Sequence, residues 1–145
     1  MTIREANKYD KTEIISMLKL FRDESPMKQF FQHDDIEHWE TILANVFAGQ
    51  GKIFIEEGKG LFFCAIIPSI WSAKVLVLHE IAWYVLPEYR QGRTGYKLLK
   101  AYLDYANEQK NNGRIAYFTL SKIISSPNLK YEKLGFRKID ENWIQ

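Results

Sequence analysis

A short turn contains residue types that could bind phosphate: Arg90, Gly92, Arg93 and Gly95. It follows the apolar run VLVLHEIAWYVL and precedes the amphipathic segment YKLLKAYLDYANEQK, an order that predicts a strand, a turn and a helix. Free backbone N–H groups and the positive end of the dipole at the start of such a helix attract anions. The arginines add positive charge, and the glycines allow close approach to a ligand or positive φ. The sequence therefore predicts a phosphate-binding turn.

The spacing of this turn differs from that of the two best-known phosphate loops. A P-loop requires GxxxxGK[ST] and the dinucleotide-binding fingerprint requires GxGxxG, and the chain contains neither. The turn resembles the pyrophosphate-binding turn of the GNAT acetyltransferase superfamily, in which Arg or Gln is followed by two residues, Gly, one residue, and Gly or Ala. Here the pattern covers Arg90-Gln91-Gly92-Arg93-Thr94-Gly95, with Arg93 at the position of the first glycine.

Two further segments are similar to the same family. WYVLPEYR, directly before the turn, resembles the family's strand end and its Pro-Glu-Tyr-Arg sequence. Tyr131 to Phe136 resembles the family's YEKLGF segment. Because both segments occur in the expected order and at roughly the family's separation, they favour membership over an ordinary β-turn-α crossover with incidental arginines.

Length and composition indicate one globular domain. With 145 residues, we expect a single domain over residues 1–145 with one core. The 46% hydrophobic and 26% charged fractions are typical of a soluble protein. No apolar run is long enough to span a membrane, and the N-terminal residues lack the apolar core of a signal peptide. The single cysteine fits a reducing compartment, so we expect a cytoplasmic protein without a membrane partner.

Metal and nucleic-acid binding have little support. His33, His38 and His79 lack the spacing of metal ligands, so no metal is expected. Cys64 lies in the apolar run LFFCAII, where a buried structural thiol is expected in preference to a catalytic one. The net charge of +2, with acidic and basic residues interspersed, gives no reason to expect a nucleic-acid partner.

Hydrophobic periodicity predicts the element order β-α-α-β-β-β-α-β-α-β. Consecutive hairpins followed by a β-α-β crossover imply an α/β protein with a central mixed β-sheet flanked by helices. This is the order of the GNAT acyl-CoA N-acyltransferase fold. Helices are expected after Asp10, after Asp34, and over 94–111 and 127–134, and strands over 2–6, 52–57, 61–67, 75–86, 114–120 and 137–144.

The resemblance implies an N-acetyltransferase that moves an acetyl group from its co-substrate, acetyl-CoA, to a primary amine. In the family, the donor lies where two neighbouring parallel strands diverge, here 75–86 and 114–120. Its pantetheine arm pairs with the backbone at Trp83, Tyr84 and Val85. Its pyrophosphate binds the turn formed by Arg90, Gln91, Gly92, Arg93, Thr94 and Gly95.

The reaction needs a neutral amine, so a general base must first remove a proton from the ammonium group. The resemblance points to Glu80, in the strand that lines the cleft. Its apolar neighbours, such as Leu78 and Trp83, predict a raised carboxyl pKa, whereas a glutamate paired with a basic neighbour at a strand bulge is the structural alternative. A bulge would change which side chains face the cleft, so His79 is a second candidate. Tyr131 matches the tyrosine that protonates the departing thiolate, with plain core packing as its alternative.

The sequence leaves the acceptor open. In the family the link between the first two helices, here about residues 22–38, shapes the acceptor pocket. Here it carries groups that could attract a cationic amine: Asp23, Glu24, His33, Asp34, Asp35 and His38. A polyamine, an amino sugar, a peptide N-terminus and a lysine side chain all fit, so small-molecule and protein acceptors both stay open.

The alternative function is a non-catalytic acyl-CoA-binding or interaction protein with the same fold. Two departures from the family motivate it: Arg93 in the turn, and the few residues after Phe136, where the family commonly has a longer two-strand hairpin. The far wall of the acceptor site is then either reduced or completed by a second subunit, which makes a homodimer one of the expected assemblies.

Overall fold

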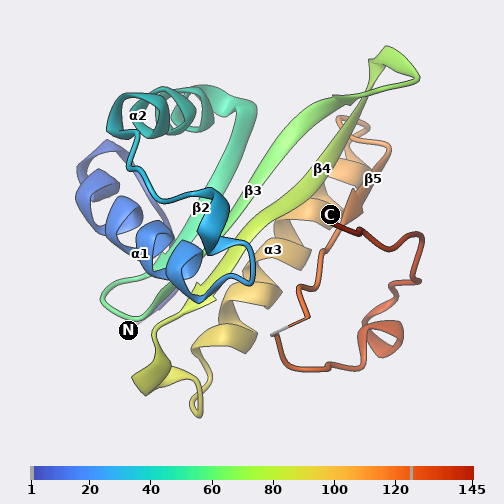
Figure 1. The fold of residues 1–145 in the computed structure, drawn as a ribbon. Coiled ribbons are helices and arrows are strands. Elements are labelled where there is room, and N and C mark those ends of the chain that lie inside the picture. Colours follow the sequence, from blue (N-terminus) through green and yellow to red (C-terminus); the bar gives the residue numbers. More distant parts are fainter. Residues whose placement is uncertain (1, 125) are drawn as a thin grey trace.

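Helices cover both faces of a five-stranded sheet in the computed structural model, which describes residues 2–124 and 126–145 (Figure 1). The strands are β1 (Arg4–Glu5), β2 (Gly51–Glu56), β3 (Gly60–Ser69), β4 (Ser72–Val85) and β5 (Tyr117–Thr119). The α-helices are α1 (Lys11–Glu24), α2 (Ile36–Asn45) and α3 (Thr94–Asn111). Short turns of other helix types are η1 (Lys8–Asp10), η2 (Lys28–Phe30), η3 (Val46–Gln50), η4 (Pro87–Tyr89) and η5 (Tyr131–Leu134).

The sheet is mixed, as the sequence predicts. Its order is β1-β2-β3-β4-β5, antiparallel from β1 to β4, and β5 runs parallel to β4. Parallel neighbours need a crossover connection, and α3 supplies it between β4 and β5. The crossover places the start of α3 close to the end of β4, where the predicted phosphate-binding turn lies.

Two apolar cores, one on each face of the sheet, hold these helices in place. On one face, α1 and α2 bury Ile14, Met17 and Leu43 against β2 and β3. On the other face, α3 buries residues spaced at one helical turn, such as Leu98 and Tyr102, against β3 and β4. Figure 1 shows α1 and α2 on the opposite side of the sheet from α3. The turn before α3 is therefore attached to a well-packed helix.

The C-terminal segment differs from the prediction. The strand expected over 137–144 is absent from the described residues, and the helix expected over 127–134 is reduced to the single turn η5. In RKIDENWI, Ile139 and Trp143 would share one face of a strand with Arg137 and Glu141, so the strand would have no continuous apolar face to bury. Ile139, Trp143 and Ile144 are all largely exposed.

Candidate functional site

The predicted cleft lies where β4 and β5 part. The two strands pair only from Val77–Tyr117 to His79–Thr119, whereas β4 continues to Val85. Leu86 N–H donates to the Lys59 carbonyl at 2.8 Å, and hydrogen-bonded pairs alternate along an antiparallel ladder.

The register therefore directs the backbone groups of Tyr84 towards β3. Those of Trp83 and Val85 point to the opposite edge, beyond the end of β5. Of the three residues predicted to pair with a pantetheine arm, Trp83 and Val85 thus have backbone groups that point to the open edge, and Tyr84 does not. The Val85 carbonyl already accepts a hydrogen bond from Arg90 Nε, which leaves the Val85 N–H and the backbone groups of Trp83 for a ligand.

A β-bulge in β4 sets the direction of Glu80. Phe63 pairs with Ala82 and Cys64 with Glu80, so Ile81 has no partner in β3. A bulge reverses the alternation of side chains, and it lets Glu80 share the α3-covered face with the later residue Trp83. The strand therefore contains the bulge considered from the sequence, and no basic residue in the described part of the chain pairs with Glu80.

Glu80 is a carboxylate in a poorly solvated environment. Burial raises its pKa to about 7, and the Ser121 N–H, which donates to Oε2 at 3.3 Å, opposes that shift only in part. Burial, and then the charge of Glu80, raise the pKa of Tyr131, so Tyr131 lies within electrostatic range of Glu80. The base and acid candidates come from segments 51 positions apart in sequence.

His79 faces the other side of the sheet. It pairs across the strands with Ala65, which packs on the α1 and α2 core, and its Nδ1 lies 2.5 Å from Thr119 Oγ1. Burial lowers the pKa of His79. The ring is therefore neutral near pH 7 and is held by β5, away from the face that carries Glu80.

The turn before α3 presents free donors. Gly92 N–H donates to the Tyr89 carbonyl and Lys97 N–H donates to the Arg93 carbonyl. Between these bonds, the backbone N–H groups find no acceptor among the residues that the structure describes; they belong to Arg93, Thr94, Gly95 and Tyr96. Several such donors at a helix start form an anion-binding site.

Arg93 fits this turn without backbone strain. Its φ is −103°, so it avoids the left-handed region, and the glycines of the turn also have no positive φ. A Cβ at Gly95 would lie 3.7 Å from Val85 Cγ2, an ordinary contact. The turn therefore does not need glycines at these positions in order to fold. Close approach of a ligand to the backbone is the other reason for glycines there.

A buried carboxylate contacts the start of α3 from the interior of the protein. Glu56, at the end of β2, is fully buried and accepts a hydrogen bond of 2.7 Å from the Thr94 hydroxyl. Burial alone would raise its pKa, but Lys97, 2.5 Å from Oε2, and Thr94 outweigh burial and lower it. The hydroxyl of Thr94 therefore points into the protein, and only its backbone N–H is available to a ligand.

The side chain of Arg90 is hydrogen-bonded to Glu24, at the end of α1. Its Nη2 donates to Glu24 Oε1 at 2.8 Å and Oε2 at 2.9 Å, and its Nε donates to the Val85 carbonyl at 2.8 Å. The Tyr84 hydroxyl donates to the same carboxylate, and the guanidinium lies over the Tyr84 ring. The sequence predicts Glu24 in the acceptor link and not beside the turn, and it does not indicate Glu56 at all, because both residues act through contacts between distant segments.

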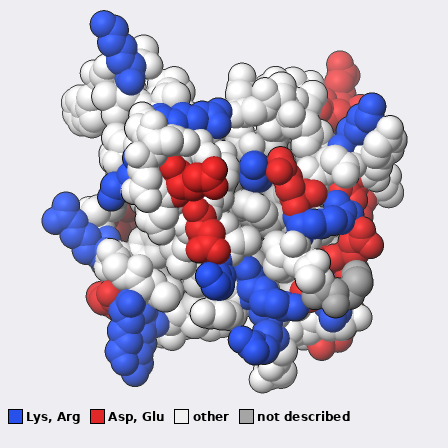
Figure 2. Space-filling model, turned by 180° about the vertical axis from the view of Figure 1, so that it is seen from behind, with Lys and Arg blue, Asp and Glu red and all other residues white. Residues whose placement is uncertain are grey.

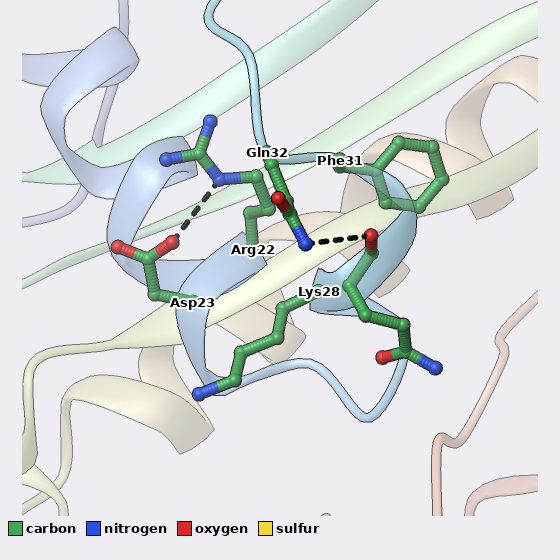
Figure 3. Close-up of a pocket in the computed structure, with 6 residues that line it drawn as sticks. Arg22, Asp23, Lys28, Phe31 and Gln32 are labelled. Atoms are coloured by element: carbon green, nitrogen blue, oxygen red, sulfur yellow. Dashed lines mark hydrogen bonds and ion pairs between the residues drawn. The ribbon is translucent and has the colours of Figure 1, made fainter.

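The predicted acceptor link contains a hollow of about 330 Å³ (Figure 3). The acidic residues that the sequence marks as candidates in the link have partners. Asp23 pairs with Arg22 at 3.1 Å, Asp34 pairs with Arg22 and Lys19, and Asp35 accepts the His38 N–H at the start of α2. Asp23 and Asp34 are therefore paired with basic side chains, whereas Asp35 is held only by a neutral N–H group. The hollow is lined by Arg22, Asp23, Lys28, Gln29, Phe31 and Gln32.

Charge elsewhere is mixed. Figure 2 shows basic and acidic side chains interspersed over the face opposite to that of Figure 1. Within the described ranges, no group of three or more His, Cys, Asp or Glu side chains is placed to hold a metal ion. None of the helices described is long and apolar enough to cross a bilayer.

Comparisons with known proteins identify the family. A sequence profile of the acetyltransferase (GNAT) family matches residues 13–136. The chain belongs to this family. No curated protein sequence matches it. The GNAT profile ends at Phe136, so it includes the diverging strands, the turn and Tyr131.

Solved structures share the GNAT fold over nearly the whole chain. A predicted acetyltransferase with acetyl-CoA from Clostridium acetobutylicum has a TM-score of 0.71 and 19% identity, covering 99% of this chain and 94% of that one. An aminoglycoside acetyltransferase from an uncultured soil metagenomic sample, in complex with sisomicin, has a TM-score of 0.67 and 15% identity, with coverages of 99% and 95%. A ribosomal-protein-alanine N-acetyltransferase from Brucella melitensis biovar Abortus 2308 has a TM-score of 0.64 and 12% identity, with coverages of 100% and 99%.

Proposed function

We propose that this GNAT protein is an N-acetyltransferase that uses acetyl-CoA to acetylate a primary amine. The observation that carries the proposal is the row of free backbone N–H groups at the start of α3, beside the edge of β4 that β5 leaves unpaired. A pyrophosphate needs such donors, and an extended amide-containing arm needs an open strand edge.

The residues around this edge fit coenzyme A. The backbone groups of Trp83 and the N–H of Val85 would pair with the pantetheine arm, and the N–H groups of Arg93 to Tyr96 would hold the pyrophosphate. When bound, acetyl-CoA would supply an acetyl group activated as a thioester.

Glu80 and Tyr131 would move the protons. A carboxyl with a pKa of about 7 is well matched to accept a proton from an ammonium group near neutral pH. Burial, and then the charge of Glu80, raise the pKa of Tyr131, so its hydroxyl stays protonated and can donate to the departing thiolate. The N–C bond forms as the C–S bond breaks. Glu80 would accept the first proton from the ammonium group, Tyr131 would protonate the departing thiolate, and the second proton, lost by the nitrogen as the amide forms, would restore the Tyr131 hydroxyl.

The acceptor is proposed as a primary amine that does not depend on a cluster of free acidic groups. Asp23, Asp34 and Glu24, three acids of the 22–38 link, already pair with basic side chains, which weakens the case for a polyamine. Their partners are Arg22, Lys19 and Arg90. An aminoglycoside acetyltransferase and a ribosomal-protein-alanine N-acetyltransferase share the fold, so amino sugars and peptide N-termini both belong in the test. The lone, buried Cys64 favours a cytoplasmic setting.

Two measurements test the proposal. Millimolar acetyl-CoA should raise the melting temperature, because a ligand bound only by the native state stabilises it by mass action. Release of free thiol from acetyl-CoA should then depend on one member of an amine panel that includes amino sugars, a polyamine, and peptides with free N-termini or lysines. No thermal response would contradict acetyl-CoA binding. Binding without thiol release on any amine would favour the alternative, a non-catalytic acyl-CoA-binding protein.

A further inference from the structure

Glu24 is the last residue of α1, and it has no place in the function proposed so far. Its carboxylate nevertheless contacts both elements that border the donor site. It accepts hydrogen bonds from Arg90, in the turn, and from the Tyr84 hydroxyl, near the end of β4. The three side chains join α1, β4 and the turn, although Glu24 and Arg90 lie 66 positions apart in sequence.

The geometry holds the Arg90 guanidinium at two of its three nitrogens. Nε is bound to the Val85 carbonyl and Nη2 to both oxygens of Glu24. Nη1 has no acceptor among residues 2–124 and 126–145. A guanidinium carries five N–H donors in one rigid plane, so fixing two nitrogens also fixes the direction of the third.

We propose that Glu24 is a positioning residue for donor binding: it orients Arg90 so that Nη1 can donate to a pyrophosphate oxygen of coenzyme A. The inference rests on the proposed function, because it requires the pyrophosphate to bind at this turn. Tyr84 supports the arrangement by donating to Glu24, and burial followed by the Glu24 contact raises the pKa of Tyr84 to about 12, so its hydroxyl stays a donor.

Two opposing effects decide the sign of a Glu24 substitution. Removing the carboxylate takes a negative charge away from the neighbourhood of an anion, which favours binding. It also frees a long side chain that must then be ordered when the ligand binds, which disfavours binding. Both Glu24 and Arg90 are more than two-fifths exposed, so water and salt weaken the repulsion, and the ordering effect should win.

The test is a double-mutant cycle on coenzyme A binding, measured by calorimetry. Glu24→Ala should raise the Kd of coenzyme A by about three- to tenfold, the cost of ordering one long side chain. Arg90→Ala should raise it at least as much. In the R90A background, E24A should have no further weakening effect, because Glu24 acts only through Arg90. A merely structural role for Glu24 would instead lower affinity equally in both backgrounds.

Glu57→Ala is the matched control. Glu57 is an exposed carboxylate that, like Glu24, accepts hydrogen bonds from an arginine: Nε and Nη2 of Arg4 donate to it. Unlike Glu24, it has no hydrogen bond to the described residues of the turn before α3. It should change the Kd little. Unchanged or tighter coenzyme A binding by the E24A variant would overturn the inference and leave the proposed function standing. Failure of the wild-type protein to bind coenzyme A would refute the proposed function itself.

Discussion

Glu80 combines a raised pKa with a place at the parting of two strands, so its role can be tested one atom at a time. Glu80→Gln keeps the size of the side chain but cannot accept the proton, and it should lower turnover by about 10²- to 10⁴-fold. Coenzyme A affinity should stay within about twofold of wild type, since Glu80 has no proposed part in holding the donor. Thiol release with the best amine of the panel measures turnover, and calorimetry measures affinity.

The pH dependence gives a second readout for Glu80. Because the carboxyl must be ionised to act as a base, turnover should rise with pH and level off above about 7, the pKa that burial gives it. Glu108→Gln, on the exposed face of α3, is the matched control and should change neither the turnover nor its dependence on pH. If the Glu80 variant kept wild-type turnover while a His79→Gln variant lost it, the base would be His79.

Tyr131 is tested by removing its hydroxyl alone. Tyr131→Phe keeps the ring that packs in η5, and it should lower turnover by about 10²- to 10⁴-fold with little change in coenzyme A affinity. Comparing kcat and Kd separates this acid role from packing, since a packing defect would also weaken binding or lower the melting temperature. Turnover at the wild-type level would show that Tyr131 is only structural.

At the scale of elements, local patterns were predicted well and long-range contacts were not. The helix 94–111 has the bounds that its apolar stripe and its Asn-Asn-Gly end predict. By contrast, the hydrogen bond from Thr94 to Glu56 spans 38 positions, and nothing in the periodicity of either segment indicates it. The prediction of a strand over 137–144 was wrong for a local reason. Its residues have too little preference for extended chain to form a strand when no continuous apolar face can be buried.

Gly95 tests the turn as an element. A Cβ there meets only ordinary contacts in the protein, the nearest being Val85 Cγ2 at 3.7 Å, so the fold should tolerate a substitution. Gly95→Val should weaken coenzyme A binding by about tenfold or more, because a branched side chain occupies the space where backbone and phosphate would meet. Calorimetry supplies the Kd, and a melting curve shows that the variant is folded.

The control for Gly95→Val is Gly95→Ala. The family pattern allows Gly or Ala at this position, and alanine suits a helix better than glycine, by about 1 kcal/mol. The alanine variant should therefore be as stable as wild type or more stable, with nearly unchanged affinity. If the valine variant also bound coenzyme A like wild type, the turn would not be the phosphate site.

At the scale of the whole molecule, the two cores suggest how one sheet would serve both a donor and an acceptor under the proposed function. The core under α3 fixes the turn and Glu80, whereas the core under α1 and α2 fixes the 22–38 link. The sheet lies between them, and the bulge in β4 changes which of its side chains face each core. Donor and acceptor would therefore approach from different sides and meet at the gap where β4 and β5 part.

Burying Glu80 should also leave a signature in the stability of the molecule. Its pKa rises from 4.5 to about 7 on folding, so the folded state favours the protonated form. The stability from this group is fully present below pH 4.5 and is lost as pH rises through 7. Compared with the E80Q variant, the wild type should lose on the order of 3 kcal/mol of unfolding free energy between pH 4 and pH 8.

Urea titrations of both proteins at each pH measure this difference. Taking the difference cancels groups that both proteins share, including His79, whose pKa burial lowers and whose contribution therefore changes in the opposite direction. Glutamine resembles the protonated carboxyl, so the two curves should coincide at low pH and separate as Glu80 ionises. Curves that stay parallel from pH 4 to pH 8 would mean that Glu80 ionises in the folded protein as readily as in water. Its burial would then not tune it for proton transfer.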